Sequence, residues 1–214
     1  MPRKRKETDF QNENTAGRIF KQAMGLFLRK GYHGTTVDEI AEAAGFSKGA
    51  FYWYFKSKED VLKEILRQYE QLRLDAMIKA VGEVKGTAID KLGKLDRFNI
   101  AFGFYNAELS VSFITLGAEL VGNHDSIEPE IRRIYKKQQD FMASLVVQGK
   151  KEKIFRRALD PQMVAQALIA FQDGTLLRWF MDRDTMDGRA YVNTCSEIFL
   201  KGLIEPRMAD VPSP

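Results

Sequence analysis

The chain has 214 residues, of which 44% are hydrophobic and 29% charged, a balance that excludes a disordered or fibrous protein. The formal net charge of +4 permits a nucleic acid or an anionic surface as a partner without requiring either. A single cysteine, Cys195, excludes an intrachain disulfide. Because no apolar run approaches the ~18 residues of a membrane span and no signal-peptide core is visible, we expect a cytoplasmic protein without membrane contact.

Four consecutive basic residues, at positions 3–6, open the chain and are followed by a polar stretch that reaches Asn14. We expect residues 1–13 to form a flexible arm. A solvated tail and a DNA-contacting arm both fit this composition. The second is favoured only if a DNA-binding domain follows directly.

Apolar residues recur at three- and four-residue spacing through most of the chain, which predicts an all-α fold. The first helix is expected over 14–30, with a stop at Gly31. A second helix, over 37–44, starts after Thr35 or Thr36, where Glu39 can complete a capping box. After Gly45, a third helix is expected over 48–54. Two short helices around a tight glycine-containing turn form a helix-turn-helix.

A longer helix begins near Ser57 and keeps its apolar spacing toward the glycines at 82 and 86. Further helices are expected over 87–105, 107–121, 127–152, 161–182 and 188–203. The sharpest boundary is Asp160-Pro161, an N-cap followed by proline at the first helical position. We therefore predict an arm (1–13), a helix-turn-helix domain (14–57), a linker helix (58–80), a larger helical domain (81–205) and a tail (206–214).

The sequence pattern TTVxxIAxxAGFSKGAFYxYFxSKE at positions 35–59 resembles the DNA-binding signature of the TetR family. Upstream, RIxxxAxxxFxxxGY at 18–32 fits the same family, so the resemblance covers about residues 14–62. Met24-Gly25 departs from the family, which often has alanine and a polar residue there. The resemblance implies a dimeric all-helical regulator with an N-terminal helix-turn-helix and a larger C-terminal ligand-binding and dimerisation domain.

The third predicted helix contains three consecutive aromatic residues, which cannot all face inward on one helix. An aromatic triplet is most often core, but exposed aromatics beside lysines are typical of a binding surface. Small residues at the start of this helix would let its backbone approach base edges in the major groove. By resemblance, the residues facing the groove are Lys48, Gly49, Ala50, Tyr52 and Trp53. The resemblance assigns phosphate contacts to Thr36, Tyr54 and Lys58.

The C-terminal part has no motif of its own but is rich in aromatic residues, which favours a hydrophobic or flat effector. Most of these aromatic residues are expected to be ordinary core residues. Our candidates for ligand contact are Phe102, Tyr105, Phe113, Phe141, Phe171 and Gln172. Polar side chains that could orient the ligand are Asn106, Glu108, Ser112, Glu119, Gln172 and Asp173.

By resemblance, the last two helices form the interface of a homodimer. The residues we assign to it are Leu168, Thr175, Tyr191, Cys195 and Phe199. A two-fold dimer presents two recognition helices about 34–36 Å apart, which predicts a pseudopalindromic operator.

The predicted function is a transcriptional regulator, a repressor released from operator DNA by a small hydrophobic ligand. The alternative is a DNA-binding regulator without a small-molecule effector, controlled by a protein partner, and activation stays open. With two histidines, one cysteine, no glycine-rich phosphate loop and no metal-ligand cluster, we expect no catalysis, no cofactor and no metal.

Overall fold

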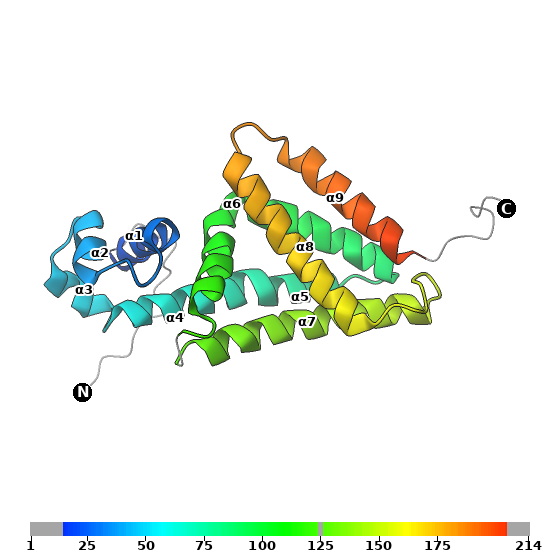
Figure 1. Ribbon diagram of the computed structural model, residues 1–214, viewed down its shortest axis with the longest axis horizontal. Coiled ribbons are helices and arrows are strands. Elements are labelled where there is room, and N and C mark those ends of the chain that lie inside the picture. Colours follow the sequence, from blue (N-terminus) through cyan, green and yellow to red (C-terminus); the bar gives the residue numbers. More distant parts are fainter. Residues whose placement is uncertain (1–14, 124–125, 205–214) are drawn as a thin grey trace. The chain divides into compact units, whose positions relative to one another are not determined.

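The computed structural model describes residues 15–123 and 126–204 (Figure 1). The predicted arm and tail lie outside the described residues. Within the described ranges the regular structure is helical, and β pairing is limited to an isolated bridge between Phe155 and Ile204. The all-α fold predicted from apolar spacing is confirmed. No helix in these ranges is long and apolar enough to cross a membrane.

The chain groups into two compact units that do not follow each other in sequence. Of the described residues, unit 1 contains 15–69, 108–123 and 126–131, and unit 2 contains 70–107 and 132–204. The predicted domains were consecutive segments. The reason for the difference is that the segment 108–131 makes its contacts with the N-terminal helices, as the interactions of Glu119 described below show.

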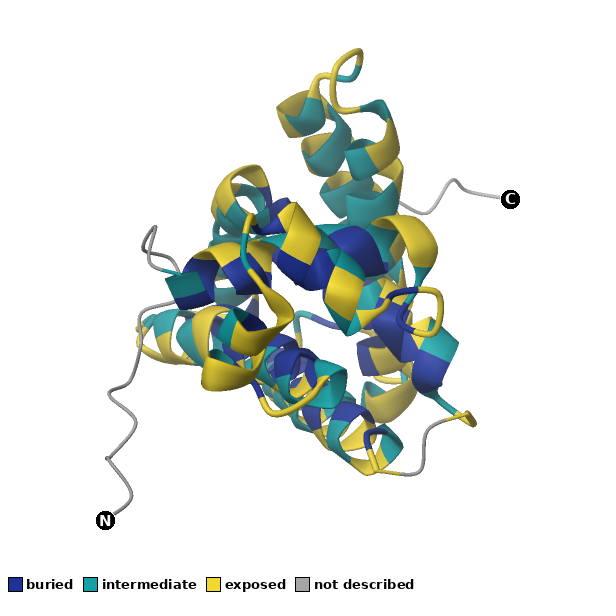
Figure 2. Cartoon of the chain, turned by 90° about the vertical axis from the view of Figure 1, so that its left-hand side faces the viewer, coloured by how far each residue is buried: buried dark blue, intermediate teal, exposed yellow. Residues whose placement is uncertain are grey.

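Unit 1 contains the helix-turn-helix. Its helices are α1 (Thr15–Lys30), α2 (Val37–Ala43), α3 (Lys48–Tyr54) and α4 (Lys58–Gln68), with the C-terminal part of α6 (Ala88–Leu120). Each helix buries one side and exposes the other, as the blue and yellow faces in Figure 2 show. The side chains completely buried in this unit include Ile19, Ile40, Phe51, Val61 and Leu62. The glycines predicted to stop α1 and α2, Gly31 and Gly45, both have a φ of +74°, which glycine adopts at no steric cost.

The predicted linker helix is interrupted by a π-helical segment. After α4, η1 (Tyr69–Asp75) has π-helical geometry, and α5 (Ala76–Gly82) follows. A π-helical turn takes up an extra residue and shifts the phase of the side chains, which periodicity counting on an ideal helix cannot foresee. At this segment Tyr69 stacks on Phe113 within unit 1, with ring centroids 3.8 Å apart. The chain passes from unit 1 to unit 2 immediately after Tyr69.

Helix α6 combines two of the predicted helices. Asn106, the residue between the predicted spans 87–105 and 107–121, has φ −137° and ψ 29°, which is non-helical, so the predicted break is confirmed as a kink. The first part of α6 belongs to unit 2 and the second part to unit 1.

Unit 2 is completed by most of α7 (Glu128–Lys151), by α8 (Pro161–Asp182) and by α9 (Gly188–Leu203). The predicted start of α8 is confirmed, because the Asp160 side chain accepts a hydrogen bond from the Met163 N–H at 2.8 Å. Phe171 on α8 packs against Phe199 on α9, with centroids 5.3 Å apart. Phe104 on α6 packs against Trp179 on α8 at 5.6 Å.

Candidate nucleic-acid interface and ligand site

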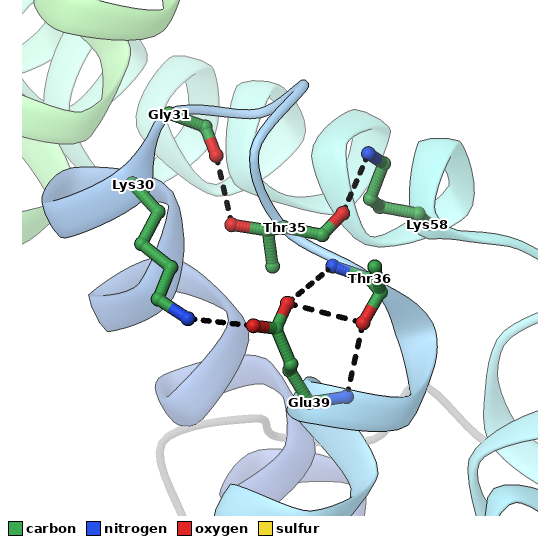
Figure 3. Close-up of polar contacts among 6 residues, drawn as sticks. All are labelled: Lys30, Gly31, Thr35, Thr36, Glu39 and Lys58. Carbon is green, nitrogen blue, oxygen red and sulfur yellow. Dashed lines mark hydrogen bonds and ion pairs between the residues drawn. The ribbon is translucent and has the colours of Figure 1, made fainter.

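The start of α2 is fixed by a complete capping box (Figure 3). The Glu39 N–H donates to Thr36 Oγ1 at 3.2 Å, and the Glu39 carboxylate accepts from the Thr36 N–H at 2.9 Å. Lys30, at the end of α1, lies 2.6 Å from the same carboxylate. Lys30 and the Thr36 donors lower the pKa of Glu39 to about 2, so the carboxylate stays ionised at neutral pH. The cap ties the first helix of the motif to α1.

Side chains from α4 and from α6 hold the loop between α1 and α2. The Glu119 carboxylate, from α6, accepts hydrogen bonds from the Tyr32 and His33 N–H groups at 2.8 and 3.0 Å. Lys58, at the start of α4, donates to the carbonyl oxygens of Tyr32 and Thr35 at 2.6 and 2.7 Å (the Thr35 bond is drawn in Figure 3). This loop, which precedes Thr36, is therefore bound to both α4 and α6.

Helix α3 exposes the surface that its sequence predicts. Ser47 caps it, accepting from the Ala50 N–H at 3.2 Å, and Phe51 is completely buried. Tyr52 and Trp53 are 49% and 78% exposed. Gly49 is also exposed, and because glycine has no side chain, little projects from the first turn of the helix. Small residues first and aromatic residues beyond them match what a helix in a major groove requires.

Lys48, the predicted base reader, is exposed and pairs with Asp38 on α2 at 2.9 Å. The hydrogen bond to Asp38 raises the pKa of Lys48, so the ammonium is charged at neutral pH. An ion pair between two exposed side chains contributes little free energy. Lys48 can therefore exchange Asp38 for a base edge at small cost.

The three predicted phosphate contacts differ in their surroundings. The Thr36 hydroxyl is engaged in the cap of α2, and Tyr54 is half-buried. The Lys58 ammonium lies 4.2 Å from the centroid of the Tyr32 ring, and burial lowers the pKa of Lys58. Two of its three N–H bonds go to the loop carbonyls. A phosphate contact by Lys58 stays a prediction, and the structure adds a second role in holding the loop.

The residues predicted to contact a ligand do not form one group. Phe113 is buried in unit 1 against Tyr69, whereas the other five belong to unit 2. In unit 2, Tyr105 is 88% exposed and Phe102 lies beside Phe98, with ring centroids 5.9 Å apart. The remaining predicted residues are partly buried: Phe141, Phe171 and Gln172.

One functional candidate escaped the sequence analysis, and a second was expected in a different role. Arg73, on η1, is buried in unit 2 with its guanidinium near the rings of Phe98 and Phe102. Glu119 was expected among the polar groups of a ligand site, but it holds the α1–α2 loop instead. Arg73 could have been found as a charged residue on the apolar face of a helix. The π-helical segment changes which residues share a face, so counting on an ideal α-helix does not place Arg73 there. The contact of Glu119 joins residues more than eighty positions apart and has no local signal.

The predicted dimer residues lie on α8 and α9 of unit 2. Leu168 is buried, and Phe199 packs against Phe171 within the chain. The Thr175 hydroxyl donates to the Phe171 carbonyl at 2.7 Å. Tyr191 and Cys195 are partly exposed. Large apolar side chains on the same two helices, Met163, Met181 and Ile198, are exposed.

No group of His, Cys, Asp and Glu side chains suited to a metal ion occurs among residues 15–123 and 126–204.

Residues 19–65 match the family model described as bacterial regulatory proteins, tetR family. The transcriptional repressor DhaR of Mycobacterium sp. (strain GP1) is 26% identical over 174 residues, which are 78% of this chain and 82% of DhaR. Residues 19–65 form a TetR-type DNA-binding domain.

Solved structures of TetR-type regulators show the same fold over nearly the whole chain. The MbdR regulator from Azoarcus sp. CIB superposes with a TM-score of 0.81 and is 27% identical. The match covers 90% of this chain and 100% of the MbdR chain. The FadR regulator of Bacillus subtilis, solved in complex with stearoyl-CoA, has a TM-score of 0.69 and 25% identity, covering 87% of this chain and 98% of that chain. The TetR-type fold thus extends through both units, beyond the residues that the family model matches.

Proposed function

We propose that this TetR-family protein represses transcription by binding a pseudopalindromic operator as a homodimer, and that a small apolar ligand in unit 2 releases it. The observation on which the proposal depends is the exposed face of α3, where Lys48, Gly49, Tyr52 and Trp53 are accessible on a helix anchored by buried Phe51. A major groove about 12 Å wide admits such a helix.

The homodimer is proposed to form through α8 and α9. Both helices keep large apolar side chains exposed in the single chain, including Met181 and Ile198. Exposed apolar side chains on neighbouring elements favour a protein interface. Two-fold symmetry then places two copies of α3 against successive major grooves, about one helical turn apart.

The ligand is proposed to be apolar because aromatic side chains from α6, α8 and α9 gather inside unit 2. Phe98 and Phe102 lie face to face, and Phe171 packs on Phe199. The similar FadR regulator was solved with stearoyl-CoA, which supports a long acyl compound as one candidate. Regulation of this kind needs no catalytic step, and we propose that the protein has none.

The chain passes between the units in η1, in α6 and in α7. Coupling between ligand and DNA is proposed to run through the first two of these segments. One is η1, which continues into α4 and Lys58. The other is α6 beyond the Asn106 kink, which ends near Glu119. Both Lys58 and Glu119 hold the loop before α2, so a ligand that shifts either segment alters the placement of the helix-turn-helix.

Measured affinities test this coupling directly. A ligand that weakens operator binding must itself bind more weakly to the operator complex, by the same factor. Typical coupling is 1 to 3 kcal/mol, which is about 5- to 150-fold. Equal ligand affinity with and without operator DNA would reject the ligand-release mechanism and favour the alternative, control by a protein partner.

A further inference from the structure

Arg73 is a buried cation with few partners. Its side chain is 8% exposed, although charged residues are rarely buried without a partner. The guanidinium donates to Met77 Sδ at 3.0 Å and lies 5.7 and 5.9 Å from the ring centroids of Phe98 and Phe102. A guanidinium has five N–H donors. Most of this hydrogen-bonding capacity is unused by the described residues, and Arg73 lies on a π-helical segment, a geometry that is frequent at functional sites.

The opposite charge near Arg73 is that of Asp173 on α8. Burial raises the pKa of Asp173 to about 6, while Arg73 and a hydrogen bond with Tyr135 act in the opposite direction. At neutral pH the two side chains are therefore mostly a cation and an anion whose charges cancel. A site with no net charge does not select an anionic ligand.

Three amide side chains in unit 2 have buried atoms without hydrogen-bond partners among the described residues. One is Gln138 on α7, through its Oε1; the other two are Asn99 on α6, through Oδ1, and Gln172 on α8, through both Oε1 and Nε2. Asn99 follows Phe98, and Gln172 precedes Asp173. Native proteins leave few buried polar atoms unsatisfied, because each such atom costs free energy. A ligand that pairs with these atoms must carry both a hydrogen-bond donor and a hydrogen-bond acceptor.

Because α6 packs on α8, Asn99 and Gln172 lie at the same height along these two helices. A Cβ built on Gly103 would lie 3.7 Å from Leu176 Cδ1, and Phe104 packs on Trp179. The first part of α6 and α8 run in the same direction in Figure 1. Asn99 lies one helical turn before Gly103, and Gln172 lies one turn before Leu176. The two side chains therefore occupy corresponding turns of neighbouring helices.

We infer that Arg73, Asn99, Gln172 and Asp173 form a polar subsite that recognises the amide-bearing acyl portion of the effector, an uncharged group with carbonyl acceptors and an N–H donor. The inference rests on the proposed function, because it specifies the ligand of that site. Carbonyl oxygens accept from Arg73 and from Gln172 Nε2, and the N–H donates to Gln172 Oε1 or Asn99 Oδ1. Phe98 and Phe102 contact the apolar part.

Related compounds satisfy this subsite less well. A carboxylate or a simple ester offers only acceptors, so the oxygens of Asn99 and Gln172 stay unpaired. A carboxylate also gains no net attraction, because the charge of Asp173 offsets that of Arg73. An acyl thioester whose thiol arm contains an amide offers both carbonyl acceptors and an N–H donor without a charge.

The test uses the full-length protein and three decanoyl probes: S-decanoyl-N-acetylcysteamine, methyl decanoate and decanoate. The first has a thioester carbonyl and an amide, the second only an ester, and the third a carboxylate. Binding is measured by calorimetry below the micelle concentration, and release of bound operator DNA by fluorescence anisotropy. The variants are Arg73→Met and Gln172→Leu, and the matched control is Arg97→Met, which removes an exposed arginine from α6 of the same unit.

We expect the wild type and Arg97→Met to bind the amide thioester about tenfold more tightly than the ester or the acid, and Arg73→Met and Gln172→Leu to lose that preference. Both variants should keep weak, equal affinity for all three probes, and a cooperative thermal transition followed by circular dichroism checks that they fold. Wild-type protein that binds and responds to the three probes alike would overturn the subsite while leaving ligand release intact. Operator binding with no response to any probe would overturn the acyl-amide assignment.

Discussion

Lys48 and Lys58 are two lysines of the helix-turn-helix region with different surroundings. Lys48 is exposed and only weakly held by Asp38, whereas Lys58 is bound to the loop carbonyls. We expect Lys48→Ala to relax specificity at particular base pairs by roughly tenfold, the size of one good base contact. Lys58→Ala should weaken binding to all sequences alike.

Anisotropy titrations on an operator and on a scrambled duplex, at several salt concentrations, separate the two roles. If Lys58 contacts a phosphate, the salt slope falls by about 0.9 in Lys58→Ala. If it acts only by holding the loop, affinity falls while the slope stays the same. Unchanged affinity in both variants would reject the assignment of α3 to the groove.

Gly49 provides a substitution that changes the proposed interface without disturbing the fold. A Cβ at this position would meet only the Ser47 hydroxyl, at 3.7 Å, which is ordinary contact. Alanine is favoured over glycine within a helix by about 1 kcal/mol. Gly49→Ala should therefore leave the melting temperature unchanged or higher while lowering operator affinity roughly tenfold. Full operator affinity would show that the first turn of α3 does not approach the bases.

Asp173 predicts a dependence of stability on pH. Its pKa is raised from 3.8 to about 6 in the folded chain, so the folded state binds more protons than the unfolded state between these values. The contribution of Asp173 to stability is therefore greatest at low pH and declines as pH rises from about 4 to about 6, by at most about 3 kcal/mol. Urea unfolding of wild type and Asp173→Asn at pH 4.5 and 7.5 checks this. The variant should gain stability relative to the wild type at the higher pH, and parallel profiles would contradict the shift.

At the scale of elements, the loop between α1 and α2 depends on a single carboxylate from α6. Glu119→Gln keeps one acceptor oxygen but turns an amide donor toward a backbone N–H. We expect faster hydrogen exchange at the amides of Tyr32 and His33 and a loss of roughly 1 kcal/mol in operator binding. Glu108→Gln, an exposed change in the same part of α6, is the control. Equal exchange in the two variants would show that Glu119 does not hold the loop.

The elements that the sequence predicted well are those with local signals. The capping box at Thr36, the caps at Ser47 and Asp160, and the glycines after α1 and α2 specify helix ends within a few residues. The kink at Asn106 was predicted as a break between two helices. The DNA-binding helices could therefore be placed from sequence together with their exposed side chains.

The elements that the sequence analysis missed depend on distant contacts or on unusual helix geometry. The π-helical segment at Tyr69–Asp75 breaks the 3.6-residue period, so neither the segment nor buried Arg73 could be read from apolar spacing. Aromatic content alone did not separate ligand contacts from core, and it grouped Phe113 of unit 1 with residues of unit 2.

At the scale of the whole molecule, we propose that DNA binding in unit 1 is joined to ligand binding in unit 2 through two of the three chain segments that connect the units. Each segment changes helix geometry near the boundary: the π-helical turn after Tyr69 and the kink at Asn106. Departures from regular helix geometry concentrate bending in a few residues. These two positions are where we expect a ligand-dependent change to be localised.

The central claim is that this protein recognises a specific operator through α3. The most direct measurement is fluorescence anisotropy of the purified protein on the intergenic DNA upstream of its own gene, at two salt concentrations with unlabelled competitor DNA. We expect tight binding that survives competitor, weakens with salt according to the number of phosphates neutralised, and is lost when Trp53 and Lys48 are both replaced by alanine. Binding that is weak, lost at the higher salt concentration and equal for this DNA and a scrambled duplex would contradict recognition of that site. The same result across a random-sequence selection would contradict operator recognition through α3.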